Sequence, residues 1–240
     1  MPGYTTKQEC IAVRGVADLQ IRSLLDRQQF ADPLGEAAAL GVSPALWPLF
    51  GLLWPSGHEL AAQMACHALP PGQRVLEIGS GLALASLVCH RRGADVTASD
   101  CHPLAESFLL ENLRLNGLQP MKYRHGPWSG LASPSDFPAR RALHGRFELL
   151  IGSDVLYERD DDGVLPGFIA RHAQQAVCVL IVDPDRSNRS AFVRRMRNFG
   201  FELTETRLDR PSAVDDPGYK GRLLRFERDG GPGLLPSRSD

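Results

Sequence analysis

The chain has 240 residues, of which 43% are hydrophobic and 23% charged, a composition typical of a globular protein with a buried core. Its formal net charge of -1 argues against attraction of the whole chain to nucleic acid or to an anionic membrane. The sequence begins without a basic stretch followed by an apolar one, and it has no apolar run of about 18 residues. We therefore expect a cytoplasmic monomer with no membrane or nucleic-acid partner.

The five cysteines are scattered along the chain, and none belongs to a CxxC pair. Three of them directly precede a histidine, but adjacent side chains on a helix or strand point in different directions. We expect them to be small core side chains, with no structural disulfide and no metal site.

The first 72 residues are the least regular part of the chain. A strand or a hairpin is predicted within residues 10–26, and a loop then leads into a helix before the Pro–Gly turn at residues 70–72. Because that turn connects the segment closely to the first core strand, we expect residues 1–72 to form a cap on the same domain.

From residue 74 onward, predicted strands and helices alternate. Strands are predicted at residues 74–81 (a run that ends in glycines), 94–100, 121–125, 147–154 and 176–183, and helices at 82–92, 102–117, 161–174 and 188–198. Residues 200–209 and 221–228 alternate more strongly and predict a final, partly antiparallel pair. Asn112 and Asn116, four residues apart on one helix, are expected to be surface or capping residues.

This alternation predicts an α/β fold over residues 73–228, with a Rossmann-like, doubly wound sheet of seven strands. We expect the sheet to be mostly parallel, with an antiparallel last strand. Residues 127–146, which are rich in Pro, Ser and Arg, predict a surface excursion. Residues 229–240 predict a disordered tail.

Four polar or flexible residues stand at the predicted strand ends: Gly79, Asp100, Asp154 and Asp183. The carboxyl ends of parallel strands meet at one edge of the sheet, which is where ligands bind in such folds. The sequence therefore predicts a ligand site at this edge.

The segment EIGSGLALA, residues 77–85, predicts a glycine turn between a strand and a helix. A dinucleotide fingerprint would need a small residue at Leu84, and Glu77 would repel a pyrophosphate. S-adenosylmethionine, with a net charge near +1, suits Glu77, Asp100 and Asp154 better. Taken alone, the two glycines could equally form a simple tight turn, and Asp100 could equally cap the next helix. Taken together with the strand order, these features favour a site for a nucleoside.

The run VLEIGSGLALAS, residues 75–86, resembles motif I of the class I, seven-β-strand S-adenosylmethionine-dependent methyltransferases. Four further segments resemble methyltransferase family 16, which includes protein-lysine methyltransferases: LWPSGHELA (53–61), HGPWSG (125–130), SDVLYE (153–158) and DPDR (183–186). The resemblance extends from about residue 50 to residue 226. Two residues depart from the family pattern: Ala83 replaces a third glycine, and Asp185 replaces the glycine of the flavoprotein-directed enzymes.

The resemblance implies S-adenosylmethionine as cofactor and assigns roles to eleven residues of this chain. Those that would bind the cofactor are Trp54, Glu77, Gly79, Gly81, Asp100, Cys101, His102, Trp128, Ser153 and Asp154. In the family pattern, Glu77 and the glycines hold the methionine part, Asp100 binds the ribose, and Trp128 flanks the adenine. Asp154 and Tyr157 would be the catalytic residues at the junction of cofactor and substrate.

The acidic stretch GSDVLYERDDDG, residues 152–163, also permits a calcium-loop interpretation. Such a loop starting at Glu158 would need a bidentate glutamate at its twelfth position, where the chain has Ile169. The metal interpretation fails. We expect Asp154 and Tyr157 to belong to the site, and residues 160–162 to stand at a helix N-terminus, where negative charge is favourable.

The predicted function is in-line methyl transfer to a lysine side chain of a protein substrate. A small-molecule amine or another metabolite is the alternative acceptor, because the sequence does not reveal the shape of the groove. A non-catalytic nucleotide-binding module or an NAD-dependent dehydrogenase is disfavoured by Leu84, Glu77 and the SDVLY segment. Nucleic acid is disfavoured because the family's DNA-amine enzymes carry an Asn/Asp-Pro-Pro-aromatic motif, which SDVLY lacks.

Overall fold

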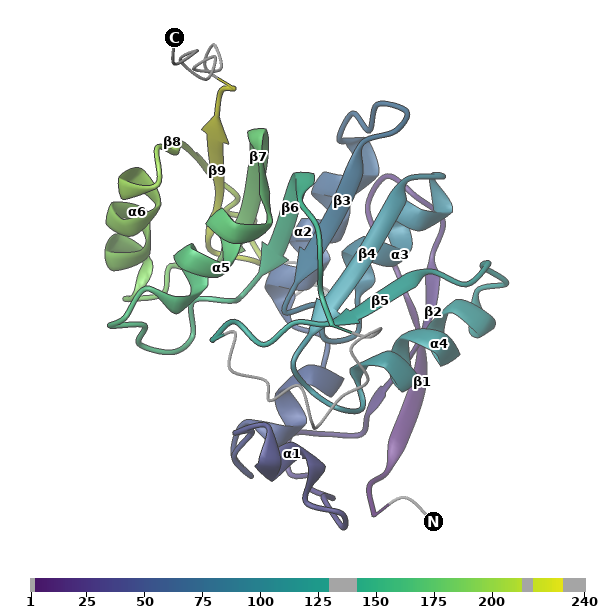
Figure 1. Ribbon diagram of the computed structural model, residues 1–240. Coiled ribbons are helices and arrows are strands. Elements are labelled where there is room, and N and C mark those ends of the chain that lie inside the picture. Colours follow the sequence, from purple (N-terminus) through teal and green to yellow (C-terminus); the bar gives the residue numbers. More distant parts are fainter. Residues whose placement is uncertain (1–2, 130–141, 213–217, 231–240) are drawn as a thin grey trace, which may run out of the picture.

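The computed structural model describes residues 3–129, 142–212 and 218–230. Two predicted segments lie mostly outside the described residues. These are the disordered tail, of which residues 231–240 are not described, and the surface excursion, of which residues 130–141 are not described. A seven-stranded sheet with helices on both faces forms the core, and a separate hairpin lies beside it (Figure 1). None of the helices in the described part of the chain has the length and apolarity that a membrane crossing requires.

The strand order of the sheet is β5-β4-β3-β6-β7-β9-β8. The strands are β3 (Arg74–Ile78), β4 (Asp95–Asp100), β5 (Lys122–His125), β6 (Phe147–Ser153), β7 (Ala173–Asp183), β8 (Glu202–Arg207) and β9 (Arg222–Arg228). Strand β9 pairs antiparallel with both of its neighbours, and the other pairs are parallel. The predicted doubly wound sheet with an antiparallel last strand is confirmed.

Two hydrophobic clusters cover the two faces of the sheet. Alternate residues of each central strand belong to different clusters, as Leu149 and Leu150 of β6 do, because successive side chains point to opposite faces. The helices are α1 (Glu36–Ala39), the 3-10 helix η1 (Trp47–Gly51), α2 (Pro55–Cys66), α3 (Leu84–Arg91), α4 (Ala105–Leu115), α5 (Val164–His172) and α6 (Arg189–Asn198). Buried residues of α2, α3 and α4 belong to one cluster, and those of α5 and α6 to the other.

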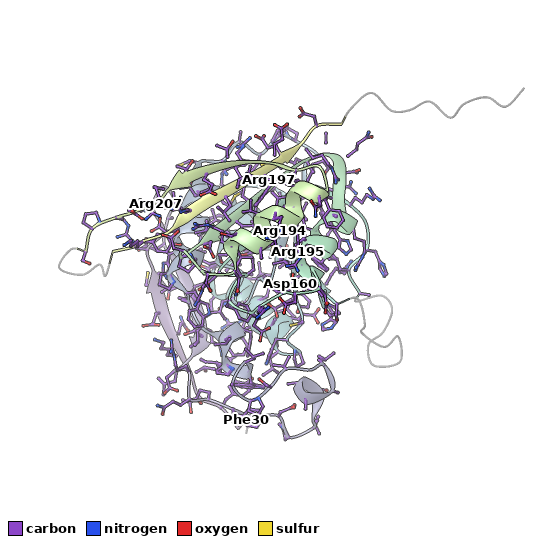
Figure 2. The ribbon with its side chains drawn as sticks, turned by 90° about the vertical axis from the view of Figure 1, so that its left-hand side faces the viewer. Phe30, Asp160, Arg194, Arg195, Arg197 and Arg207 are labelled. Atoms are coloured by element: carbon purple, nitrogen blue, oxygen red, sulfur yellow. The ribbon has the colours of Figure 1, made fainter. Side chains whose placement is uncertain are left out.

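Helix α5 is shorter at both ends than predicted. At its start, the two carboxylate oxygens of Asp160 accept the N–H groups of Val164 and Leu165 at 2.7 and 3.0 Å, which confirms the expected N-terminal role of this acid. Arg195 of α6 donates to the carbonyl oxygen of Asp160 and holds the turn from outside (Figure 2). At its end, the chain becomes extended because Ala173 pairs with β6.

The N-terminal hairpin, β1 (Thr6–Ile11) and β2 (Leu19–Leu24), attaches to the core through Asn112 of α4 and Asn116, which caps the C-terminus of α4. The Asn112 amide accepts the Arg22 N–H at 2.7 Å and donates to the Arg22 carbonyl at 3.4 Å. The Asn116 amide accepts the Gln20 N–H at 2.9 Å and donates to the Gln20 carbonyl at 2.7 Å. We call these two side chains the asparagine clamp.

The clamp depends on a match between two repeats. Four residues of an α-helix rise about 6 Å, and two residues of a strand rise about 6.7 Å. Side chains four apart on α4 therefore reach backbone groups two apart on β2. The expectation of a surface or capping role is wrong for Asn112, which is fully buried because this face of α4 meets the hairpin.

Replacing Asn112 by Ala removes both hydrogen bonds to the Arg22 backbone. We expect the free energy of unfolding to fall by about 2 kcal/mol, because buried polar groups of β2 lose their partners. Urea denaturation followed by circular dichroism measures the change. Asn198→Ala, at the exposed end of α6, is the matched control and should change the same quantity by less than about 0.5 kcal/mol. Equal effects of the two substitutions would contradict the clamp.

Candidate functional site

The turn between β3 and α3 has three residues in the left-handed region: Gly79 at φ 57°, Gly81 at φ 51° and Ala83 at φ 59°. A Cβ on Gly81 would lie 2.8 Å from the carbonyl oxygen of Phe50, which is closer than real contacts allow. Gly81 is therefore required both by its backbone conformation and by the segment packed over it. Ala83, which stands where the family motif has a third glycine, adopts the same left-handed conformation, and this conformation is strained for a residue with a Cβ atom.

Glu77 lies on β3, two residues before Gly79, and it is 3% exposed. Its Oε2 accepts the backbone N–H of Ser86 at 2.8 Å, in the first turn of α3, where the helix dipole favours negative charge. Burial nevertheless raises the pKa of Glu77 to about 7. Near neutral pH this carboxyl is poised between its two protonation states, so a cationic ligand group beside it would ionise it.

Asp100 ends β4 and connects two segments of the site. One carboxylate oxygen accepts the Gly81 N–H at 2.8 Å, and the other accepts the His102 N–H at 2.8 Å. Burial raises the pKa of Asp100, while these N–H groups act in the opposite direction. Since a carboxylate oxygen can accept more than one hydrogen bond, both oxygens keep capacity for ligand hydroxyls.

His102 belongs to an aromatic group that closes one side of the site. Its ring stacks on Phe50 with the centroids 3.7 Å apart, and Trp47 meets it edge-on at 5.4 Å. The Leu104 N–H donates to Nδ1 at 3.2 Å, and burial lowers the pKa of His102 to about 3, so the ring is neutral with its proton on Nε2. Trp47 and Phe50 were not predicted to lie here, because their contacts with His102 join residues more than 50 positions apart.

Asp154 stands directly after β6 in the left-handed region, at φ 54°, and its N–H donates to the carbonyl of Val182 at 2.9 Å. Its side chain is 9% exposed. The Arg186 guanidinium donates a hydrogen bond from Nε to Oδ1 at 2.9 Å, and its Nη2 atom lies 2.8 Å from the same oxygen in an ion pair. Arg186 ends the DPDR segment but was not among the predicted site residues, because a charged loop residue can equally be solvated.

The loop after β7 positions Arg186. Its backbone N–H donates at 2.9 Å to Oδ2 of Asp183, a buried residue whose pKa burial raises to about 6. Asp185, the departure from the family pattern, lies in the left-handed region at φ 61°. Its carboxylate accepts hydrogen bonds from three arginines: Arg189, Arg207 and Arg222. This loop is therefore held through Asp183 and Asp185, the two acids that precede Arg186.

These groups surround one cavity of about 310 Å³, a size within the usual range of small-molecule sites. All eleven residues selected from the sequence line it, and so do Phe50 and Arg186. The eleven are Trp54, Glu77, Gly79, Gly81, Asp100, Cys101, His102, Trp128, Ser153, Asp154 and Tyr157. Of the four predicted strand-end residues, Gly79, Asp100 and Asp154 line this cavity, whereas Asp183 is not among its lining residues and binds the Arg186 N–H.

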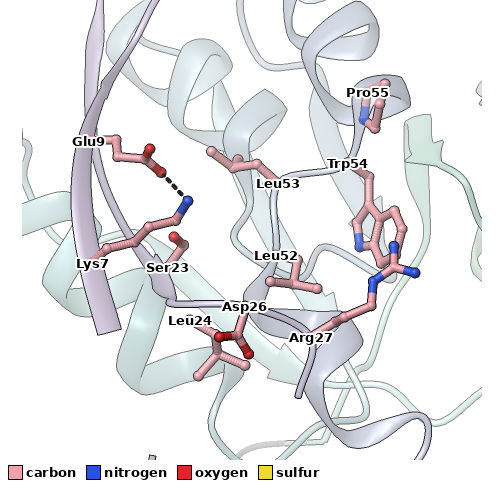
Figure 3. Close-up of a pocket in the computed structure, with 10 residues that line it drawn as sticks. All are labelled: Lys7, Glu9, Ser23, Leu24, Asp26, Arg27, Leu52, Leu53, Trp54 and Pro55. Atoms are coloured by element: carbon pink, nitrogen blue, oxygen red, sulfur yellow. Dashed lines mark ion pairs between the residues drawn. The ribbon is translucent and has the colours of Figure 1, made fainter. Parts of the chain in front are cut away.

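The two tryptophans occupy different parts of the wall. Trp128 lies against the glycine turn, where a Cβ on Gly79 would be 3.2 Å from its Cζ2 atom. Trp54 starts α2 and donates from its indole to the Leu49 carbonyl at 3.0 Å. A second cavity of about 390 Å³ shares Trp54 with the first, and there Arg27 lies over the indole ring, 5.8 Å from its centroid (Figure 3).

Comparisons with known proteins connect this geometry with one class of enzyme. No family model matches the chain. The chain is 27% identical over 212 residues to the electron transfer flavoprotein beta subunit lysine methyltransferase of Mus musculus, covering 84% of this chain and 73% of the relative. It is also 27% identical over 117 residues to the histone-arginine methyltransferase METTL23 of Homo sapiens, covering 45% and 56%.

Solved structures share the fold at lower identity. A magnesium protoporphyrin IX methyltransferase from Synechocystis, solved with bound S-adenosylmethionine, matches with a TM-score of 0.54 and 14% identity. The match covers 72% of this chain and 78% of that one. The fold is that of the class I methyltransferases, and the resemblance found in the sequence is confirmed.

Replacing Gly81 by Ala should damage the turn, because the new Cβ meets the Phe50 carbonyl and the left-handed backbone is strained. We expect the free energy of unfolding to fall by at least about 1 kcal/mol, measured by urea denaturation. Gly167→Ala is the control, since Gly167 lies within α5 with open space at its Cβ. That substitution should raise the same quantity, by up to about 1 kcal/mol. A loss of stability in both variants would contradict the assignment.

Proposed function

We propose that this class I methyltransferase transfers a methyl group from S-adenosylmethionine to the side-chain amine of a lysine in a protein substrate. One observation carries the proposal. The residues that the methyltransferase motifs select line a single cavity, and the carboxylate of Asp154 and the phenol of Tyr157 both belong to its wall.

The cavity suits the charge and shape of this cofactor. Glu77 and Asp100 are carboxyls at the glycine turn, and a ligand with a sulfonium and an ammonium favours their ionised forms. The Cβ-free positions of Gly79 and Gly81 allow the backbone to approach a ligand closely. Glu77 would hold the ammonium of the methionine part, and Asp100 would accept hydrogen bonds from the ribose hydroxyls.

When bound, S-adenosylmethionine supplies a methyl group on a positively charged sulfur. The neutral acceptor amine would form its bond to the methyl carbon as the carbon–sulfur bond breaks, with the bonding pair staying on sulfur, and the proton lost from the lysine ammonium would pass to water. Removing a proton from lysine at pH 7 costs roughly 4.6 kcal/mol, from an ordinary pKa of about 10.4. Asp154 and Tyr157 would orient the acceptor, because in-line transfer requires the nitrogen lone pair about 3 Å from the methyl carbon.

Two features support a protein lysine as the acceptor. The flavoprotein lysine methyltransferase matches 84% of this chain, whereas the histone-arginine methyltransferase matches 45%. The carboxylate of Asp154 at the cavity wall provides a partner for a cationic side chain. Asp154 stabilises the ammonium form, so its role in this proposal is to position the acceptor and not to remove its proton.

Labelled S-adenosylmethionine and a lysate from methyltransferase-deficient cells test the acceptor class. We expect label in precipitated protein, recovered as methyllysine after hydrolysis. Asp154→Asn should reduce it at least about tenfold, because the amide lacks the charge, while asparagine tolerates the left-handed backbone.

Asp161→Asn removes an exposed acid seven residues away and is the matched control, expected to leave the label unchanged. Label in small molecules would contradict a protein acceptor, and label in methylarginine would contradict lysine. Undiminished labelling by the Asp154→Asn variant would contradict the role of that carboxylate.

The raised pKa of Glu77 predicts that cofactor affinity depends on pH. In the ligand-free protein this carboxyl is protonated below about pH 7, whereas a bound ammonium favours the ionised form. The affinity for S-adenosylmethionine should therefore fall below pH 7, by up to about tenfold for each pH unit. Titration calorimetry between pH 5.5 and 7.5 measures it. Glu77→Gln should bind more weakly with a flatter pH profile, and an equal slope in both proteins would contradict this role of Glu77.

A further inference from the structure

The Asp154 carboxylate already holds a cation in this structure. The Arg186 guanidinium makes two contacts with it, and both go to the same oxygen, Oδ1. This end-on arrangement lacks the second parallel bond of a fork-to-fork arginine pair. The arginine side chain is 40% exposed, whereas that of Asp154 is 9% exposed. Arg186 therefore covers an otherwise enclosed carboxylate on its solvent side.

The backbone of Arg186 is anchored to residues other than Asp154. Its N–H donates to Asp183 at 2.9 Å, and its carbonyl accepts the Arg189 N–H at 3.2 Å. Within the described residues, the hydrogen bond and the ion pair of the guanidinium both go to Asp154. The side chain can therefore leave the carboxylate by rotating about its own bonds, without moving the loop.

The neighbouring carboxylate behaves differently. Asp185 receives Arg189, Arg207 and Arg222 together, an arrangement that ties α6, β8 and β9 to one loop. Its partners are held in a network, so the exchange of any one of them disturbs the others. In the part of the chain that the structure describes, Asp154 pairs with one cation, Arg186, and it lies in the cavity wall. Of these two carboxylates, Asp154 is therefore the one that can exchange its cation.

The backbone at Asp154 holds the carboxylate in place. The residue has φ 54°, a costly conformation for a residue other than glycine, and its N–H is bound to the Val182 carbonyl. Strain of this kind persists where the surrounding structure enforces it, and it occurs often at ligand sites. The Asp154 backbone thus stays in place at the cavity wall when the cation on its side chain changes.

We infer that the Asp154 carboxylate is the subsite for the cationic head of the acceptor, and that Arg186 occupies it until an acceptor ammonium displaces the guanidinium. The inference rests on the proposed function and adds a selectivity device to it. A cationic acceptor replaces one charge partner by another, so the carboxylate is never left unpaired. An uncharged acceptor would either leave the Asp154–Arg186 ion pair in place or break it without offering the carboxylate a new positive charge.

Binding of n-butylammonium to the full-length protein saturated with S-adenosylhomocysteine tests this inference. Titration by ligand-observed NMR or calorimetry gives the Kd for the wild type and for Arg186→Ala. We expect the Kd of the variant to be at least tenfold lower, because the probe no longer competes with the arginine. Arg186→Gln, which keeps a polar side chain without the charge, should shift the Kd in the same direction.

Two further variants separate competition from a general charge effect. Combining Arg186→Ala with Asp154→Asn should abolish the gain in affinity, because the carboxylate that receives the probe is lost. Arg194→Ala removes the same charge from an exposed position of α6 and should leave the Kd unchanged (Figure 2). Thermal unfolding of each variant establishes that it is folded.

The outcomes distinguish this inference from the function on which it rests. Equal Kd values for wild type and Arg186→Ala, or a gain that persists in the double variant, would overturn the inference alone. Failure of S-adenosylhomocysteine to bind the wild type would overturn the proposed function and this inference with it.

Discussion

The hydrogen bond from the Gly81 N–H to Asp100 determines how the parts of the site fit together. It holds the glycine turn against the end of β4, and the same carboxylate also receives the His102 N–H. With the turn held there, Gly81 lies against the Phe50 carbonyl, and Phe50 stacks on His102. A single buried side chain thereby connects two strands of the sheet to the N-terminal segment that covers them.

Much of the fold follows from local pattern, and so does part of the site. The alternation of strands and helices predicted the sheet, because each buried strand and amphipathic helix has its own periodicity. The polar strand ends predicted the location of the site for a similar reason, since parallel strands place their carboxyl ends together. Motif spacing then selected residues such as Trp54 and Trp128, which local periodicity alone would have assigned to the core or a lid.

Contacts between distant segments were not predictable in the same way. The asparagine clamp joins residues 90 or more positions apart, and nothing in the local sequence of α4 identifies its partner. Arg186 and Asp154 are 32 positions apart, and their pairing depends on the turns after β6 and β7. Likewise, the net charge of -1 conceals local clustering, since three arginines gather on Asp185 while one faces Asp154.

The asparagine clamp also affects which surfaces of the hairpin remain available to other chains. The N–H and carbonyl groups of Gln20 and Arg22 face away from β1, toward the amides of α4. A sheet edge with open groups of this kind invites a strand from another molecule, and such pairing leads to aggregation or domain exchange. The two amides take the place of that strand. The hairpin can therefore lie beside the domain as a two-stranded unit without recruiting a third strand along β2.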